Sequence, residues 1–225
     1  SLLVALDDGV ITVDSKVDVG GGVLNMHGSK MKDHNWTRGG YNRALDVTEI
    51  MMYSSNVGTS VLIDNNYHSN PQKFVDGLKR VGIGEPLGLP FSGMADPRIR
   101  SPKSEYWSKT SLAWMSIGYE NQIPPISSVT FYNAIANGGK MMKPYIVERV
   151  ERDGVAEKTY NPILLNSICS EATADTLTRA LKRVTSDGTA KVLKDARCTV
   201  AGKTGTARMY LTPAEQMGSG NPYED

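Results

Sequence analysis

Two short groups of residues in this chain carry side chains that could do chemistry together. The first is Ser54-Ser55-Asn56 and the second is Lys203-Thr204-Gly205-Thr206, far along the chain. Hydroxyl groups can attack a carbonyl or relay a proton, an ammonium can bind a carboxylate, and a side-chain amide can hydrogen-bond a peptide backbone. Each group alone is common, because Ser54 and Asn56 also suit helix capping and Lys203 also suits a solvated strand.

The surrounding sequence predicts the elements that would position these two groups. Asp46 and Glu49 have the spacing of a capping box and predict a helix over residues 46–54. Apolar spacing predicts a second helix over residues 57–66, so the first group falls at a junction between helices. Residues 198–209 are expected to form a strand that carries the second group. The order is therefore a loop between helices, followed by a strand.

The remaining patterns indicate a mixed domain. An apolar helix is expected over residues 1–8, followed by a polar, turn-rich stretch over 10–42 with extended pieces at 10–13 and 23–26. Asn70-Pro71 starts another helix, an irregular loop covers 83–103, and a short helix covers 107–115. Pro124-Pro125 starts a helix, Asp153-Gly154 turns a hairpin over 143–160, and Ser170 caps a helix over 171–186, with a short helix near 189–194. Helices in the middle and strands towards the end favour an α+β fold.

Composition excludes several classes of function. The chain has 225 residues, 40% hydrophobic and 22% charged, which is ordinary for a globular domain. A net charge of +1 without a long basic run argues against a nucleic-acid partner. No apolar stretch approaches the length of a membrane span, so this segment is expected to make no membrane contact.

Metal and disulfide chemistry receive little support from the sequence. His27, His34 and His68 lack a metal-ligand spacing, so no metal site is expected. Cys169 and Cys198 lack the C-x-x-C spacing of a zinc site. They could form one disulfide in an oxidising compartment or remain two free thiols, and the sequence leaves both readings open.

Taken together, these groups resemble two of the three motifs of penicillin-binding proteins and serine β-lactamases, S-x-x-K, S-x-N and K-T-G. Ser54-Ser55-Asn56 corresponds to S-x-N, the second motif, and Lys203-Thr204-Gly205 corresponds to K-T-G, the third motif. The resemblance covers most of the chain and is nearest to the class B, monofunctional penicillin-binding proteins, with a lean towards the division-specific branch. The segments that carry it are Tyr53–Gly58, Ser116–Tyr119, Ala134–Gly139 and Gly202–Ala207. Two departures affect the groove: Glu120 stands where the family usually has glycine, and Pro124-Pro125 stands where it often has Thr-Pro.

The resemblance implies a fold and an activity. The fold would be that of the serine β-lactamases and transpeptidases, with an antiparallel sheet packed against helices and a mostly helical subdomain, incomplete in this chain. The activity would be peptidoglycan D,D-transpeptidation, in which a serine attacks a D-Ala-D-Ala stem peptide, forms an acyl-enzyme and passes the acyl group to a second peptide. Such acyl transfer needs no cofactor.

The resemblance also assigns roles to residues of the two motifs. Ser54 would relay a proton to the leaving amine, and Asn56 would hydrogen-bond the substrate backbone. Lys203 would place positive charge near the substrate carboxylate, which the hydroxyls of Thr204 and Thr206 would bind. Two backbone roles complete the set: Gly205 would let the substrate lie along the strand as an added β-strand, and the N–H of Thr206 would form half of the oxyanion hole.

The nucleophile motif S-x-x-K is expected outside these residues. In the family it opens the helix whose continuation resembles residues 1–9, so the nucleophile should lie just before Ser1. Ser29-Lys30-Met31-Lys32 fits the letters but sits in polar, turn-rich sequence without an apolar helical face. Family domains also continue beyond K-T-G with further strands. Residues 1–225 are therefore expected to be a partial transpeptidase domain, inactive alone and dependent on other segments or on self-association.

The implied partners are peptidoglycan stem peptides, β-lactam antibiotics and cell-division proteins, at the periplasmic face of the cytoplasmic membrane. Two alternatives remain open. One is a transpeptidase-like module that binds without turnover, which the residues upstream of Ser1 would decide. The other is a β-lactamase or D,D-carboxypeptidase, in which water is the acceptor. Class A β-lactamases use a glutamate for that step, and Glu120 is the one left open here.

Overall fold

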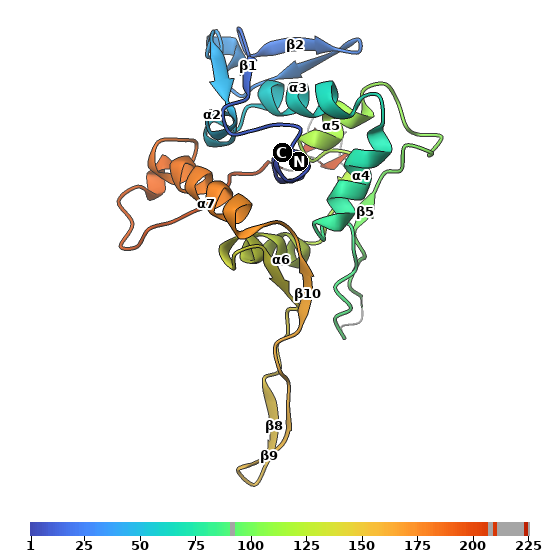
Figure 1. Cartoon of the computed structure of the whole chain (residues 1–225), viewed down its shortest axis with the longest axis vertical. Helices are drawn as coiled ribbons and strands as arrows, with labels where there is room; N and C mark the ends of the chain where they lie inside the picture. Colours follow the sequence, from blue (N-terminus) through green and yellow to red (C-terminus); the bar gives the residue numbers. More distant parts are fainter. Residues whose placement is uncertain (91–92, 207–208, 211–222, 225) are drawn as a thin grey trace.

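The structure is a computed structural model that describes residues 1–90, 93–206, 209–210 and 223–224. Figure 1 shows a helical body from which one long β-hairpin projects. The helices are α1 (Leu2–Asp7), α2 (Val47–Met52), α3 (Asn56–Tyr67), α4 (Pro71–Arg80), α5 (Ser111–Ser116), α6 (Pro125–Ala136) and α7 (Glu171–Ser186), with 3-10 turns η1 (Trp36–Arg38) and η2 (Lys191–Leu193). Most of the helices predicted from the sequence are confirmed.

The described strands pair only as two-stranded antiparallel ribbons. The pairs are β1 (Lys16–Asp18) with β4 (Ala44–Asp46), β2 (Val23–Met26) with β3 (Ser29–Lys32), β5 (Arg98–Ile99) with β6 (Asn121–Gln122), β7 (Lys140–Met142) with β10 (Leu164–Ser167), β8 (Arg149–Arg152) with β9 (Val155–Thr159), and β11 (Met209–Tyr210) with β12 (Tyr223–Glu224). The β8–β9 ribbon is the projecting hairpin of Figure 1, and its turn at Asp153-Gly154 is as predicted.

Helix α1 lies at the centre of the hydrophobic core. Its residues Leu2 to Ala5 are all buried, and it contacts α3, α4 and α7. Gly77 of α4 lets that helix approach closely, because a Cβ at this position would lie 2.4 Å from Cγ1 of Val4. The core therefore joins the beginning of the chain to helices from its middle and its end.

A polar cluster fixes the end of α1 against two other helices. Asp8, the C-cap of α1, accepts a hydrogen bond from the Tyr67 hydroxyl at 2.7 Å and another from the Arg80 guanidinium at 2.6 Å. Burial alone would raise the pKa of Asp8, but these two hydrogen bonds, together with the positive charges of Arg80 and Lys73, hold the pKa below its ordinary value. The cluster thus sets the position of α1 relative to α3 and α4.

Helix caps predicted from the sequence are present at the starts of α2 and α7. Asp46 accepts from the Glu49 N–H while the Glu49 carboxylate accepts from the Asp46 N–H, which is the predicted capping box at α2. Ser170 accepts from the Thr173 N–H at 3.1 Å and begins α7. These caps satisfy N–H groups that a helix start otherwise leaves without partners.

Two strand predictions are wrong. Residues 10–13 form no strand, and the first extended pairing comes instead at β1. The strand predicted over 198–209 is wrong for residues 198–206, because no described strand pairs with their backbone, and of its described residues only the last, Met209, lies in a strand, β11. A strand exists only when a partner supplies ladder hydrogen bonds. The part of the predicted strand at 207–208 lies outside the described residues.

Within the described residues, no helix combines the length and hydropathy that crossing a membrane requires.

Candidate active site

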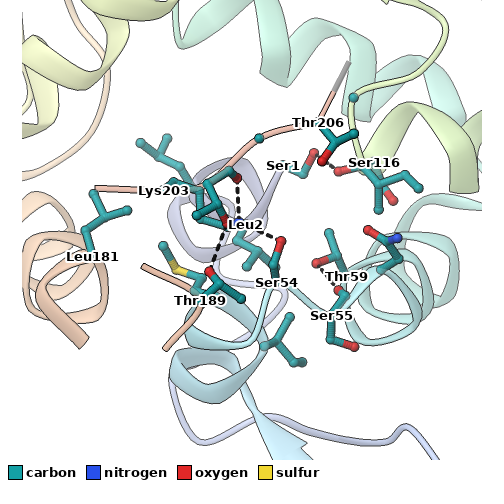
Figure 2. A pocket seen from close by; sticks show the side chains of 18 of the residues that line it. Ser1, Leu2, Ser54, Ser55, Thr59, Ser116, Leu181, Thr189, Lys203 and Thr206 are labelled. Atoms are coloured by element: carbon teal, nitrogen blue, oxygen red, sulfur yellow. Dashed lines mark hydrogen bonds between the residues drawn. The ribbon is translucent and has the colours of Figure 1, made fainter. Parts of the chain in front are cut away.

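A cleft of about 650 Å³ lies where the α2–α3 junction meets the end of α5 and the segment 203–206. Figure 2 shows side chains from these segments converging on it. The lining includes Ser54, Asn56, Lys203, Thr204, Gly205 and Thr206, together with Ser1, Leu2, Ser116, Ile117, Gly118 and Tyr119. Every site residue predicted from the sequence therefore borders one cleft.

Lys203 and Ser54 meet inside this cleft. The Lys203 ammonium donates a hydrogen bond to the Ser54 hydroxyl at 2.6 Å and a second to the Thr204 carbonyl at 2.9 Å. Burial lowers the pKa of Lys203, since a charged ammonium loses hydration there. Because Ser54 Oγ accepts from Lys203, its own proton stays available for donation to a bound group.

The backbone places Ser54 by an uncommon conformation. Helix α2 ends with Tyr53 as its C-cap, and Ser54 follows with a left-handed φ of 54°. Its N–H donates to the Met51 carbonyl at 3.2 Å, which closes the end of α2. The next residue, Ser55, already caps α3 by accepting from the Gly58 N–H at 2.9 Å. The short junction thus turns the chain sharply and directs the Ser54 side chain towards Lys203 (Figure 2).

Asp33 holds the second motif in place through buried hydrogen bonds. Asp33 was not identified from the sequence as part of the site. This carboxylate is 1% exposed and accepts from the Ser55 hydroxyl at 2.9 and 3.1 Å and from the Val57 N–H at 2.9 Å. Burial raises the pKa of Asp33, while those hydrogen bonds oppose the rise. A single aspartate in a polar stretch has no spacing that would reveal this contact.

Asn56 is held by the residue beside Asp33. Its side-chain N–H donates to the Lys32 carbonyl at 2.8 Å. The last residue of β3, Lys32, and the residue after the strand, Asp33, therefore anchor the second motif at two neighbouring points. With one N–H so used, the Asn56 amide keeps its carbonyl oxygen and its second N–H for other partners.

The third motif is held by contacts with the end of α7 and the loop after it. Gly202 donates its N–H to the Leu181 carbonyl at 3.3 Å, and the hydroxyls of Thr189 and Thr204 lie 2.9 Å apart. A Cβ at Gly205 would meet nothing within 4 Å, so the space beside it is open. Thr204 and Thr206 are exposed at the same edge of the cleft.

The opposite wall follows α5. Gly118 has a φ of 104°, and Glu120 has a φ of 65°, a value that glycine adopts more easily. The Glu120 carboxylate pairs with Arg100 and accepts from the Ser111 hydroxyl at 3.3 Å. It does not line the cleft. Glu120 is therefore poorly placed to activate a water molecule in the cleft.

The alternative serine and the cysteines are also located. Ser29 opens β3, where residues three apart point to opposite faces, so Ser29 and Lys32 do not share a helical face. The Lys32 ammonium lies 4.0 Å from the Trp36 ring centre instead. Cys169 and Cys198, both among the described residues, carry free thiols.

Comparison with known proteins identifies the family. Residues 1–221 match the model of the penicillin-binding protein transpeptidase domain, and the chain belongs to this family. It is 28% identical over 211 residues to the probable peptidoglycan D,D-transpeptidase PbpC of Pseudomonas aeruginosa, a match that covers 92% of this chain and 34% of that protein. It is 28% identical over 169 residues to penicillin-binding protein PbpB of Mycobacterium tuberculosis, covering 72% and 24% respectively.

Solved structures confirm the fold. The D,D-transpeptidase domain of a peptidoglycan glycosyltransferase from Eggerthella lenta aligns with a TM-score of 0.79 and 25% identity, over 92% of this chain and 51% of that one. The apo transpeptidase domain of Burkholderia pseudomallei penicillin-binding protein 3 aligns with a TM-score of 0.75 and 25% identity, over 94% and 58%. The chain spans about a third of the PbpC relative's length and about a quarter of PbpB's.

Proposed function

We propose that this chain is the part of a peptidoglycan D,D-transpeptidase domain that carries the second and third motifs of a serine acyltransferase. The observation that carries the proposal is the hydrogen bond from Lys203 to Ser54, two side chains from separate motifs that meet in an open cleft. Family membership supports the reaction class. The substrate would be a D-Ala-D-Ala stem peptide, and the first product an acyl-enzyme.

In this proposal Ser54 carries the proton to the leaving amine. The Lys203 ammonium holds the Ser54 oxygen as an acceptor, so the Ser54 proton points away from Lys203 and towards the cleft. A proton donor is needed because an amide nitrogen leaves only when it is protonated. The Ser54 oxygen then regains a proton from the nucleophile's side of the site.

The other motif residues bind and orient the peptide. Positive charge on Lys203 and the exposed hydroxyls of Thr204 and Thr206 suit the terminal carboxylate of the donor. The open space beside Gly205 suits an extended peptide lying along the segment. The free groups of the Asn56 amide suit the peptide backbone, and the Thr206 N–H would contribute to the oxyanion hole.

The nucleophile is proposed to lie in a segment that precedes Ser1 in the complete domain. Such a segment would place an S-x-x-K serine one or two helical turns before α1, whose start borders the cleft at Ser1 and Leu2. Because the nucleophile is proposed outside it, residues 1–225 alone would not form an acyl-enzyme.

The cellular setting follows from the same proposal. Peptidoglycan cross-linking takes place outside the cytoplasm, so we place the complete protein at the periplasmic face of the cytoplasmic membrane. Stem peptides and β-lactam antibiotics would be its ligands, and the reaction would need no cofactor. A role beside cell-division proteins is the setting suggested by relatives named FtsI.

Mass spectrometry with a penicillin tests this proposal. The complete domain should gain one covalent adduct, mapped to a serine upstream of Ser1, and the chain 1–225 should gain none. An adduct on Ser54 or Ser29 would overturn the placement of the nucleophile. No adduct on the complete domain would favour a binding module without turnover.

The lifetime of the adduct separates transpeptidase from hydrolase. In a transpeptidase the penicilloyl adduct should last much longer than one catalytic cycle of a β-lactamase. The enzyme should also transfer a donor peptide to an added amino acceptor. Rapid loss of the adduct to water would instead identify a β-lactamase. Lys158→Ala, on the projecting hairpin, serves as a control that should leave acylation unchanged.

A further inference from the structure

Two histidines and an aspartate gather at the end of α3 remote from the cleft. Asp64 lies in the last turn of α3, His68 is the C-cap of this helix, and His27 lies in the turn between β2 and β3. Asp64 is eight residues beyond Asn56, or about 12 Å along the helix at ~1.5 Å per residue. The cluster is therefore separate from the catalytic motifs, and sequence spacing gave no indication of it because His27 comes from a distant segment.

The three side chains point at one place. The Nε2 atom of His27 is 2.9 Å from one oxygen of Asp64, and the Nδ1 atom of His68 is 3.3 Å from the other. The two imidazole rings stack with centroids 4.8 Å apart and an interplanar angle of 11°. One ligand atom from each residue lies within 4.8 Å of the others.

Local sequence explains this convergence. Asp64 and His68 are four residues apart, so they share one face of α3. His27 and Gly28 both have positive φ, 49° and 92°, as a tight two-residue hairpin turn requires. Asn25 steadies that turn by accepting the Gly28 N–H at 3.0 Å. The turn therefore holds His27 over the helix face that bears the other two.

Electrostatics at this position favours a cation. The Asp64 carboxylate supplies negative charge, and the carbonyl end of α3 adds a partial negative charge where His68 caps the helix. The side chains of His27, Asp64 and His68 are 25%, 13% and 58% exposed. An ion can therefore enter from solvent while Asp64 remains mostly covered.

We propose that His27, Asp64 and His68 form a binding site for a divalent transition-metal ion, with Zn²⁺ as the best match. Imidazole nitrogen and carboxylate oxygen are zinc ligands at about 2.0–2.2 Å, which puts neighbouring ligand atoms about 3.3–3.5 Å apart. The Asp64 contacts are already near that spacing. Rotation of the exposed His68 ring brings the two nitrogens together, and water completes the coordination.

A metal here would act as a clamp between two elements that position the active-site residues. It would tie the β2–β3 ribbon to α3. Strand β3 and helix α3 are already in contact. Strand β3 ends at Lys32, and Asp33 follows it; these two residues hold Asn56 and Ser55. Binding would therefore stabilise the fold around the second motif without touching substrate. The site itself does not depend on the proposed transpeptidase activity.

Calorimetric titration of the tag-free complete domain with ZnCl₂ tests the site, with Co²⁺ absorption reporting the coordination. We expect one saturable site per chain and a rise in Tm that EDTA reverses. The variants His27→Ala, His68→Ala and Asp64→Asn should each weaken Zn²⁺ binding by at least about tenfold. Loss of an outer-shell partner alone typically weakens metal binding by about 10–100-fold, and these residues would be direct ligands. Asp64→Asn is the sharpest variant, because it keeps hydrogen bonding to the imidazoles and removes the anionic ligand.

The matched control is His34→Ala, which removes the third histidine, one that lies outside the cluster. Its affinity for Zn²⁺ should equal that of the unmodified chain. Absence of saturable binding, or equal affinity in His34→Ala and the three cluster variants, would overturn the proposal and leave a hydrogen-bonded cluster only. Circular dichroism of each variant confirms that it is folded before titration, and Asp64→Asn decides the matter if a histidine variant is unstable.

Discussion

Lys203 and Ser54 are 149 residues apart in the chain, yet the Lys203 Nζ and Ser54 Oγ atoms lie 2.6 Å apart. The contact depends on two independent supports. Asp33 and Lys32 hold the turn that presents Ser54, and contacts with the end of α7 and the loop after it hold the segment that presents Lys203. The proposed function depends on both supports.

Ser54 stores backbone strain that glycine would relieve. A non-glycine residue at left-handed φ costs about 1–2 kcal/mol. Ser54→Gly and Ser54→Ala both lose the hydroxyl, so comparing them isolates the backbone effect. We expect urea unfolding to show Ser54→Gly more stable than Ser54→Ala by about 1 kcal/mol, with both slow to acylate in the complete domain. Equal free energies of unfolding for Ser54→Gly and Ser54→Ala would contradict backbone strain at Ser54.

The buried charge of Lys203 should lower the free energy of unfolding at neutral pH. Burial lowers the pKa of Lys203 in the folded state, so between that value and the unfolded value near 10.5 the unfolded chain binds more protons. Stability of the unmodified chain therefore rises with pH across that window. In urea unfolding, Lys203→Met should have a larger free energy of unfolding than the unmodified chain at pH 7. This difference between the two proteins should narrow as the pH rises towards 10.5. A gap that widened with pH would reverse the expected sign.

The predictions that succeeded from sequence rested on local physics. A capping box needs only Asp46 and Glu49 at fixed spacing, and the start of α7 needs only the Ser170 side chain and its neighbours. The hairpin turn at Asp153-Gly154 is likewise a local conformational preference. The two motifs came from residue order and family resemblance, and the structure places them in one cleft.

What sequence reasoning missed depended on partners distant in the chain. The strand predicted around Lys203 needs a neighbouring strand, and none pairs with residues 203–206 in the described part of the chain. Asp33 and His27 look like ordinary polar residues until folding brings them to Ser55 and Asp64. Their contacts cannot be read from spacing, because they join a hairpin to a helix.

Asp33 should be essential for holding the second motif. Asp33→Ala leaves the Ser55 hydroxyl and the Val57 N–H without their acceptor, and hydrogen bonds to a charged group contribute about 1.5–3 kcal/mol. We expect Asp33→Ala to lower the free energy of unfolding by about 2–3 kcal/mol and Asp33→Asn to lower it less, because one amide oxygen can still accept both. The exposed Asp14→Ala is the control, and a loss of similar size there would refute the specific role.

The cluster around Asp8 should govern stability in acid. Tyr67→Phe removes the hydrogen bond to Asp8 and should cost about 1–2 kcal/mol at pH 7 in urea unfolding. Because hydrogen bonding lowers the pKa of Asp8, its contribution is present above the ordinary value near 3.8 and disappears as pH falls through the lower folded value. The difference between the two proteins should therefore shrink in acid. A constant difference from pH 7 to pH 2 would argue against this linkage.

A double-mutant cycle on the complete domain tests the central contact most directly. The measured quantity is the second-order rate of penicillin acylation for Ser54→Ala, Lys203→Ala and the double variant. If the two side chains act as one unit, each single change should slow acylation by about 10²–10⁴-fold, and the double variant should be about as slow as the slower single. Losses that simply multiply in the double variant would show that Ser54 and Lys203 act independently and would contradict the account.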